Sequence, residues 1–108
     1  MTLIMTQSSD NESQDLLYVE EAESILGLLF RRYANSDEAD QFLLEPIISK
    51  AADELLAARL RLFRRGALTT PDDLAELKLL KQSIDNAADF QSIVIAALKL
   101  AAYLGAFA

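Results

Sequence analysis

The residues of this chain best placed to do chemistry are two pairs of carboxylates. Each pair has a spacing of three residues, and thirteen residues separate the pairs: Glu20 and Glu23, then Asp37 and Asp40. Residues three apart lie on one side of a helix, so each pair can point both carboxylates in one direction. Two such pairs on facing helices could hold Mg²⁺ against a pyrophosphate, which is the arrangement needed for metal-assisted hydrolysis.

This arrangement resembles the all-helical nucleotide pyrophosphohydrolases of the MazG type over residues 20 to 40. The resemblance implies a helical bundle that uses Glu20, Glu23, Asp37 and Asp40 with Mg²⁺ to release pyrophosphate from nucleoside triphosphates. The chain departs from the family pattern at Asp37, where a glutamate is expected. A structural explanation competes with it, because a solvated helix face and a capping turn also favour acidic residues at these positions.

The composition excludes most other catalytic machinery. The chain contains neither cysteine nor histidine, which rules out disulfides, thiol nucleophiles, zinc fingers and imidazole bases. Its serines and tyrosines have no histidine to activate them, and it has no glycine-rich loop to hold a phosphate. We therefore expect no enzymatic activity and no cofactor, with Mg²⁺ required only under the pyrophosphohydrolase hypothesis.

The charge balance bears on the choice of partner. Seventeen acidic and ten basic residues give a net charge of −7, which argues against direct nucleic-acid binding because that affinity comes from Lys and Arg. Dense carboxylates could instead imitate phosphates and inhibit a DNA- or RNA-binding protein, which is a second alternative function. A single basic cluster could bind an acidic partner or stabilise a helix end. It comprises Arg59, Arg61, Arg64 and Arg65.

The beginning of the chain is polar and acidic. Residues 1–23 carry six carboxylates and no Lys or Arg, and they lack the positive start and apolar run of a secretory signal. We expect a mobile polar head over residues 1–14, a single helical domain over 15–108, and a cytoplasmic location.

Apolar residues at three- and four-residue steps predict helices over residues 15–34 and 47–65. The first stripe comprises Val19, Ala22, Leu26, Leu29 and Tyr33, with Ile25, Leu28 and Phe30 beside it. The second comprises Ile48, Ala51, Leu55, Ala58 and Leu62, with Ala52, Leu56 and Phe63 beside it. We expect Ser36 to cap a helix that Pro46 either kinks or splits, and Gly66 to end it.

The clearest local signal is the stretch TTPDDLAEL. Thr70 as cap, Pro71 as first helical residue and Asp73 at the third position form a carboxylate variant of the capping box, so a helix begins at Pro71. The rest of the chain forms either one long helix to about Phe107 or two helices joined near Asn86. Together these signals predict an all-α fold, a four- to five-helix bundle with a mobile acidic N-terminal segment and an apolar C-terminal helix.

The last nineteen residues, 90–108, contain one charge, Lys99. A membrane span would place that charge near its middle without positive flanks, so we expect none. The segment is either the central helix of the bundle or, in part, a surface for another chain, since small residues at four-residue steps let a second backbone approach. The candidate partner-binding residues are Ile93, Ala97, Ala101, Tyr103, Leu104, Gly105 and Phe107.

Hydrophobic residues make up 52% of the chain without glycine, against about 45–50% with glycine in an average protein. A bundle this small has a limited interior, so apolar surface is left for a contact with another chain. The leading hypothesis is a non-enzymatic acidic interaction module, acting as a regulator, an inhibitor or an assembly factor. It self-associates as a homo-oligomer or binds a protein partner through its C-terminal helix.

Overall fold

The computed structural model describes residues 2–65 and 69–107, with side chains over 14–64 and 69–107. The described residues contain helices and no strand, which confirms the all-α expectation. The helices are α1 (Thr2–Ala34), α2 (Glu38–Arg65), α3 (Pro71–Asp85) and α4 (Phe90–Gly105).

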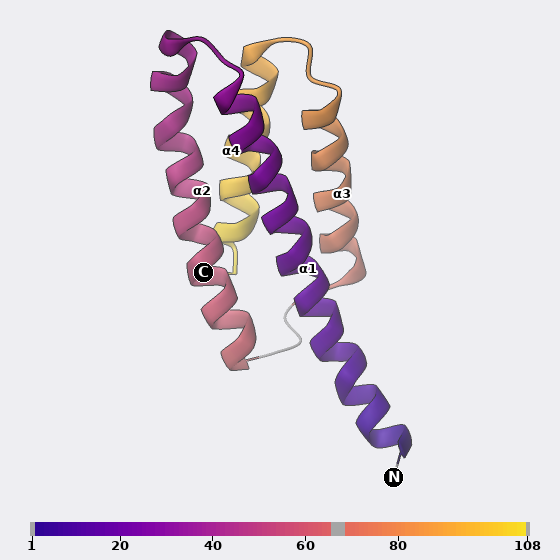
Figure 1. Ribbon diagram of the computed structural model, residues 1–108. Coiled ribbons are helices and arrows are strands. Elements are labelled where there is room, and N and C mark those ends of the chain that lie inside the picture. The colour runs from indigo at the N-terminus through magenta and orange to yellow at the C-terminus, as the bar shows by residue number, and fades with distance from the viewer. Residues whose placement is uncertain (1, 66–68, 108) are drawn as a thin grey trace.

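The helices form a bundle in which α1 and α3 run in one direction and α2 and α4 in the other (Figure 1). Helix α1 packs between α2 and α3, and α4 also packs between α2 and α3, while α1 and α4 touch only slightly across the middle. The most extensive packing joins the parallel pair α2 and α4. Helix α4 is therefore one corner of the bundle, and the expectation of a central helix enclosed by the others is wrong.

The core is built from apolar residues that alternate between four- and three-residue steps, the repeat that packs helices at shallow angles. Helix α2 follows this repeat over its whole inner side, and every member is buried: Leu44, Ile48, Ala51, Leu55, Ala58 and Leu62. Helices α1 and α4 contribute matching series: Tyr18, Ala22, Ile25 and Leu29, and Ile93, Ala97, Leu100 and Leu104.

The buried faces differ in part from the stripes that the sequence predicts. The stripe of α2 is confirmed, with Leu44 added at its start. In α1 the buried face includes Tyr18, which the predicted stripe lacks. Leu26 and Tyr33 of the predicted stripe are only partly buried, and Phe30, expected beside it, is exposed. Leu56 and Phe63 of α2, expected beside the core, are also exposed.

The turn between α1 and α2 is capped from both sides. The Ser36 hydroxyl donates to the Arg32 carbonyl at 2.7 Å, and the Gln41 side chain donates to the Tyr33 carbonyl at 3.0 Å. The Asp37 carboxylate accepts the Asp40 backbone N–H at 2.8 Å. Because α2 begins one residue later than expected, Asp37 is its cap, and the assignment of that role to Ser36 is wrong.

Helix α2 continues through Pro46 without a break. Pro46 lies on the exposed side of the helix, where water can satisfy the carbonyl that loses its partner one turn earlier. The helix is therefore not split. Gly66, expected to end it, lies outside the described residues.

The capping box at the start of α3 is confirmed. The Thr70 side chain accepts the Asp73 N–H, and the Asp73 carboxylate accepts the Thr70 N–H at 2.8 Å. Asn86 ends α3, and Asp89 caps α4. Of the two alternatives for this part of the chain, two helices joined near Asn86 are formed.

Polar residues at the two ends of the inner face of α1 fasten α3. Asp15 and Arg32 continue the four-three series of Tyr18 to Leu29 by one step in each direction. The buried Asp15 carboxylate accepts the Thr69 N–H at 3.1 Å and its hydroxyl at 2.6 Å, just before α3 begins. At the other end, the Arg32 guanidinium donates to the carbonyls of Ile84 and Asp85, both at 3.0 Å. Helix α1 thus holds α3 by both its start and its end.

The N-terminal part of α1 projects beyond the ends of the other helices (Figure 1). Its backbone is helical from Thr2, whereas the division into a mobile head over 1–14 and a domain over 15–108 stays a prediction. Among the described helices, none has both the length and the apolar character that crossing a membrane requires.

Replacing Arg32 should loosen the end of α3. Arg32→Met keeps an apolar stem but removes both hydrogen bonds to the last carbonyls, so the free energy of unfolding should fall by about 1–2 kcal/mol. Urea titration followed by circular dichroism measures the change. Arg31→Met, at the exposed neighbouring position, is the control, and an equal loss in both variants would contradict this role of Arg32.

Replacing Thr69 should loosen the start of α3. Thr69→Val keeps the shape of the side chain but removes the hydroxyl donor to the buried Asp15 carboxylate, so the free energy of unfolding should fall by about 2 kcal/mol. The same titration with Ser83→Ala is the control, because that hydroxyl is exposed and donates within its own helix, to Leu79. A Thr69→Val protein as stable as the wild type would show that the contact is unimportant.

Candidate functional site

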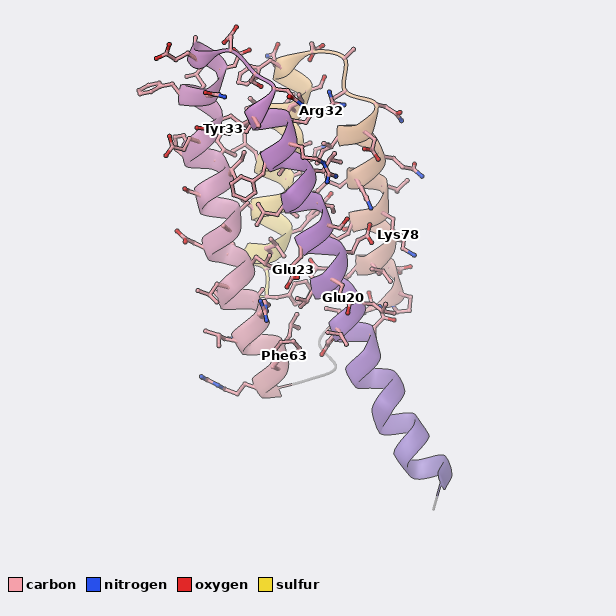
Figure 2. All side chains as sticks on the ribbon, viewed as in Figure 1. Glu20, Glu23, Arg32, Tyr33, Phe63 and Lys78 are labelled. Carbon is pink, nitrogen blue, oxygen red and sulfur yellow. The ribbon has the colours of Figure 1, made fainter. Side chains whose placement is uncertain are left out.

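The structure does not bring the two carboxylate pairs together. Glu20 and Glu23 lie exposed on α1 (Figure 2), while Asp37 caps α2 beyond the far end of α1 and Asp40 lies in the first turn of α2. Eleven residues of helix, about 16 Å, separate Glu23 from the last residue of α1. Across the described residues, no three Asp or Glu side chains are grouped so that they could hold a metal ion. The two-pair Mg²⁺ geometry is therefore not formed.

Glu23 contacts the basic cluster instead. Its carboxylate lies 3.4 Å from the Arg59 guanidinium, and both side chains are about half exposed. The same guanidinium lies 6.0 Å from the centre of the Phe63 ring. An ion pair this exposed contributes no more than about 1 kcal/mol, so it positions side chains on the outside of α1 and α2 more than it stabilises the fold.

The remaining members of the basic cluster are on the surface of α2. Arg61 and Arg64 are exposed, and the Arg65 side chain lies outside the described residues. Because the cluster belongs to the last two turns of α2, it opposes the negative end of that helix as the sequence suggests.

The candidate partner-binding residues of the C-terminal helix mostly face the bundle. Ile93, Ala97, Ala101 and Leu104 are buried in the core, and Tyr103 and Phe107 are partly buried against it. Gly105 is exposed, and a Cβ added there would lie 3.5 Å from the Glu54 carboxylate of α2. The line of small residues Ala97, Ala101 and Gly105 therefore allows close approach of α2 within the chain. A contact of these residues with another chain stays a prediction.

The end of α4 is docked on α1 through two rings. The Tyr18 and Phe107 rings pack edge to face, with their centres 5.2 Å apart. Burial, helped by the nearby Asp73 and Glu76, raises the pKa of the Tyr18 hydroxyl well above its ordinary value. Tyr18 is therefore neutral at physiological pH and serves packing, not acid–base chemistry.

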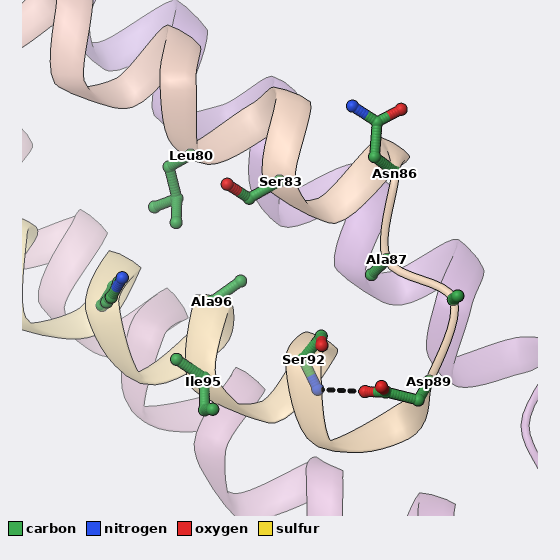
Figure 3. A pocket seen from close by; sticks show the side chains of 10 residues that line it. Leu80, Ser83, Asn86, Ala87, Asp89, Ser92, Ile95 and Ala96 are labelled. Carbon is green, nitrogen blue, oxygen red and sulfur yellow. Dashed lines mark hydrogen bonds between the residues drawn. The ribbon is translucent and has the colours of Figure 1, made fainter.

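A surface depression of about 480 Å³ lies between the end of α3 and the start of α4 (Figure 3). Its lining residues are Leu80, Ser83, Asn86, Ala87, Ala88, Asp89, Ser92, Ile95, Ala96 and Lys99. The Asp89 carboxylate accepts the Ser92 N–H at 2.7 Å, and this hydrogen bond holds the pKa of Asp89 below its ordinary value. The Asp89 carboxylate is therefore committed to capping α4.

The feature that sequence reasoning missed is an apolar stripe on the outside of α2. Leu56, Leu60 and Phe63 are 59%, 57% and 56% exposed, although they occur in the middle and last turns of a core helix. Toward the N-terminus the same four-three spacing reaches Phe42, which is 78% exposed. We call this series the outer stripe of α2: Phe42, Pro46, Ser49, Asp53, Leu56, Leu60 and Phe63. A second four-three series beside the first one in the sequence is the signal that could have revealed it.

No family model matches this chain, and neither the curated proteins nor the solved structures compared with it contain a similar protein. The class of protein is therefore given by the architecture alone, a helical bundle whose helix α2 has two apolar sides.

The cap of α4 should respond to acid. The folded-state pKa of Asp89 is lower than that of an unfolded aspartate. The stability that the ionised Asp89 carboxylate gives to the folded protein is therefore fully present above about pH 4 and is lost as the pH falls through the folded pKa. Asp89→Asn keeps a capping side chain without this titration, so its stability should fall less between pH 7 and the acid range than that of the wild type. Denaturant titrations at several pH values measure the difference. Ser83→Ala, in the same depression, should keep the wild-type dependence, and an identical profile for Asp89→Asn would contradict the assignment.

Proposed function

We propose that this protein is a non-enzymatic helical interaction module that binds another protein chain on the outer stripe of α2. The observation that carries the proposal is the double character of α2. Its inner series is fully buried in the core, while Leu56, Leu60 and Phe63 on its outside remain more than half exposed. A helix with apolar residues on two sides is typical of one that is covered on both.

The size of the exposed area supports a docking role. Burying a large apolar side chain completely stabilises by about 1.5–3 kcal/mol, so covering the exposed half of three such side chains yields about 3 kcal/mol. Association itself costs at least about 4 kcal/mol. The stripe of one copy is therefore a site for a reversible contact that needs further complementarity from the partner.

The chemistry of the rest of the chain fits a binding role better than a catalytic one. The carboxylate pairs Glu20–Glu23 and Asp37–Asp40 are held apart, and Asp37 and Asp89 each cap a helix. Binding through the C-terminal helix is limited to its outer side, where Ile95 and Leu98 are about half exposed. The role we propose is that of a regulator, an inhibitor or an assembly factor, with α2 as the principal contact and α4 as a core helix.

A paired surface substitution tests the proposal. Leu56→Glu combined with Leu60→Glu places two charges on the stripe and should reduce retention of the bound chain at least about tenfold. Immobilised wild-type and variant proteins are incubated with a cell extract and, separately, with soluble wild-type protein, and the retained chains are quantified. Leu79→Glu, on α3 and 62% exposed, is the matched control and should bind as the wild type does.

Circular dichroism must give the same helix content and melting temperature for all three proteins. The proposal fails if the wild type retains no chain from either source. It also fails if the stripe variant and the Leu79→Glu control retain equal amounts.

A further inference from the structure

We propose that the occupant of the outer stripe of α2 is the same stripe on a second copy of this chain, with the two α2 helices antiparallel. This inference rests on the proposed function and names its partner.

The charges of α2 are divided along its length. Its first part, residues 38–54, carries five carboxylates and one lysine, whereas residues 55–65 carry four arginines and no carboxylate. Two copies in parallel would place like charges together, while an antiparallel pair places the basic part of each helix beside carboxylates of the other. A two-fold axis makes both contacts identical, which is the usual symmetry of a protein dimer.

The net charge of each copy also points to this part of the surface. Each chain carries −7, so two copies repel each other over most of their surfaces. The arginines at the end of α2 are the one concentration of positive charge in the sequence, and Arg61 and Arg64 are exposed beside the stripe. A dimer contact that includes these arginines reduces the repulsion between the two copies, whereas a contact through another part of the surface does not.

The positions of the exposed apolar residues determine the register of the two antiparallel α2 helices. If the two-fold axis crosses α2 at about residue 58, Leu56 of each copy lies opposite Leu60 of the other, and the four leucines form the centre of the contact. Phe63 then lies opposite Asp53 of the second copy, next to the small, partly buried Ala52. Both copies cover their stripes at once, which doubles the buried apolar area relative to a partner that brings no apolar surface.

The same register pairs opposite charges. It places Arg64 within one residue of the level of Asp53 of the second copy, and the symmetry repeats this pair on the other side of the leucines. Both side chains are exposed, and within the described residues neither forms an ion pair inside its own chain. A register that overlaps α2 over its full length would instead place Leu60 opposite Leu43 and Leu56 opposite the partly buried Ile47, so the four leucines would no longer meet. The clustering of the four leucines therefore favours the shorter overlap.

Other occupants match the surface less well. An acidic peptide would pair with Arg61 and Arg64 but leave the leucines uncovered. An anionic lipid surface would meet the arginines together with the carboxylates of the same helix, in a chain whose net charge is negative. A second copy satisfies both the apolar and the charged parts of the stripe.

A reciprocal charge exchange tests the pairing. Sedimentation velocity over micromolar to near-millimolar concentrations should give a dimer for the wild type. Asp53→Arg and Arg64→Asp, made singly, each create like charges at two symmetric positions and should weaken the dimer at least about tenfold. The double variant, Asp53→Arg with Arg64→Asp, restores opposite charges and should restore dimerisation. Lys78→Asp changes the charge by the same amount as Arg64→Asp but lies on the outer side of α3 (Figure 2), so it should dimerise as the wild type does.

Each result has a defined meaning. A wild-type monomer over the whole range overturns the inference, whichever ligand the stripe binds instead, and single variants that dimerise as well as Lys78→Asp overturn it too. The proposed function is tested separately, because a monomer whose stripe still retains a different protein chain would preserve that function while removing the second copy as its partner. Leu60→Glu provides a second route to a monomer that does not depend on the charged pair.

Discussion

The attachment of α3 to α1 at both ends is the constraint on which the arrangement of the bundle depends. Asp15 and Arg32 are seventeen residues apart, about 25 Å along α1, and α3 with its fifteen residues is about 22 Å long. The carboxylate lies at the positive start of α3 and the guanidinium donates to the carbonyls at its negative end, so only the parallel orientation lets both contacts form. The length and the direction of α3 are both matched to α1.

Once α3 lies parallel to α1, the positions of the other two helices follow. The short connection after Asn86 turns α4 back along α3, and α4 reaches the core beside α2 and diagonally across from α1. Alanines at buried positions on both helices, such as Ala51, Ala58, Ala97 and Ala101, allow α2 and α4 to approach closely, which accounts for their extensive packing. With α1 on one side and α4 on the other, α2 has its inner side covered and its outer side open.

Local signals in the sequence predicted more of this structure than patterns that depend on neighbouring helices. The capping box at Thr70 was predicted correctly because its donors and acceptors lie within four residues, whereas Ser36 and Asp37 can both cap and differ by one position. Asp15 gives no sign in the sequence that it is buried, since its partner Thr69 is far along the chain. Glu20 and Glu23 lie in one helix as expected, but Asp37 lies before the start of α2, and the separation of the two pairs depends on the length of α1. Leu56 and Phe63 were assigned beside the core because they lie one position from buried residues.

One guanidinium connects the fold to its outer surface. Arg59 is held by Glu23 of α1 and lies over the Phe63 ring of α2, so the position of an aromatic ring at the edge of the outer stripe depends on an exposed ionic contact between two helices. Dissolved salt weakens exposed ionic contacts of this kind, while the packing of the buried leucines in the core does not depend on charge. The shape of this surface is therefore sensitive to ionic strength in a way that the bundle beneath it is not.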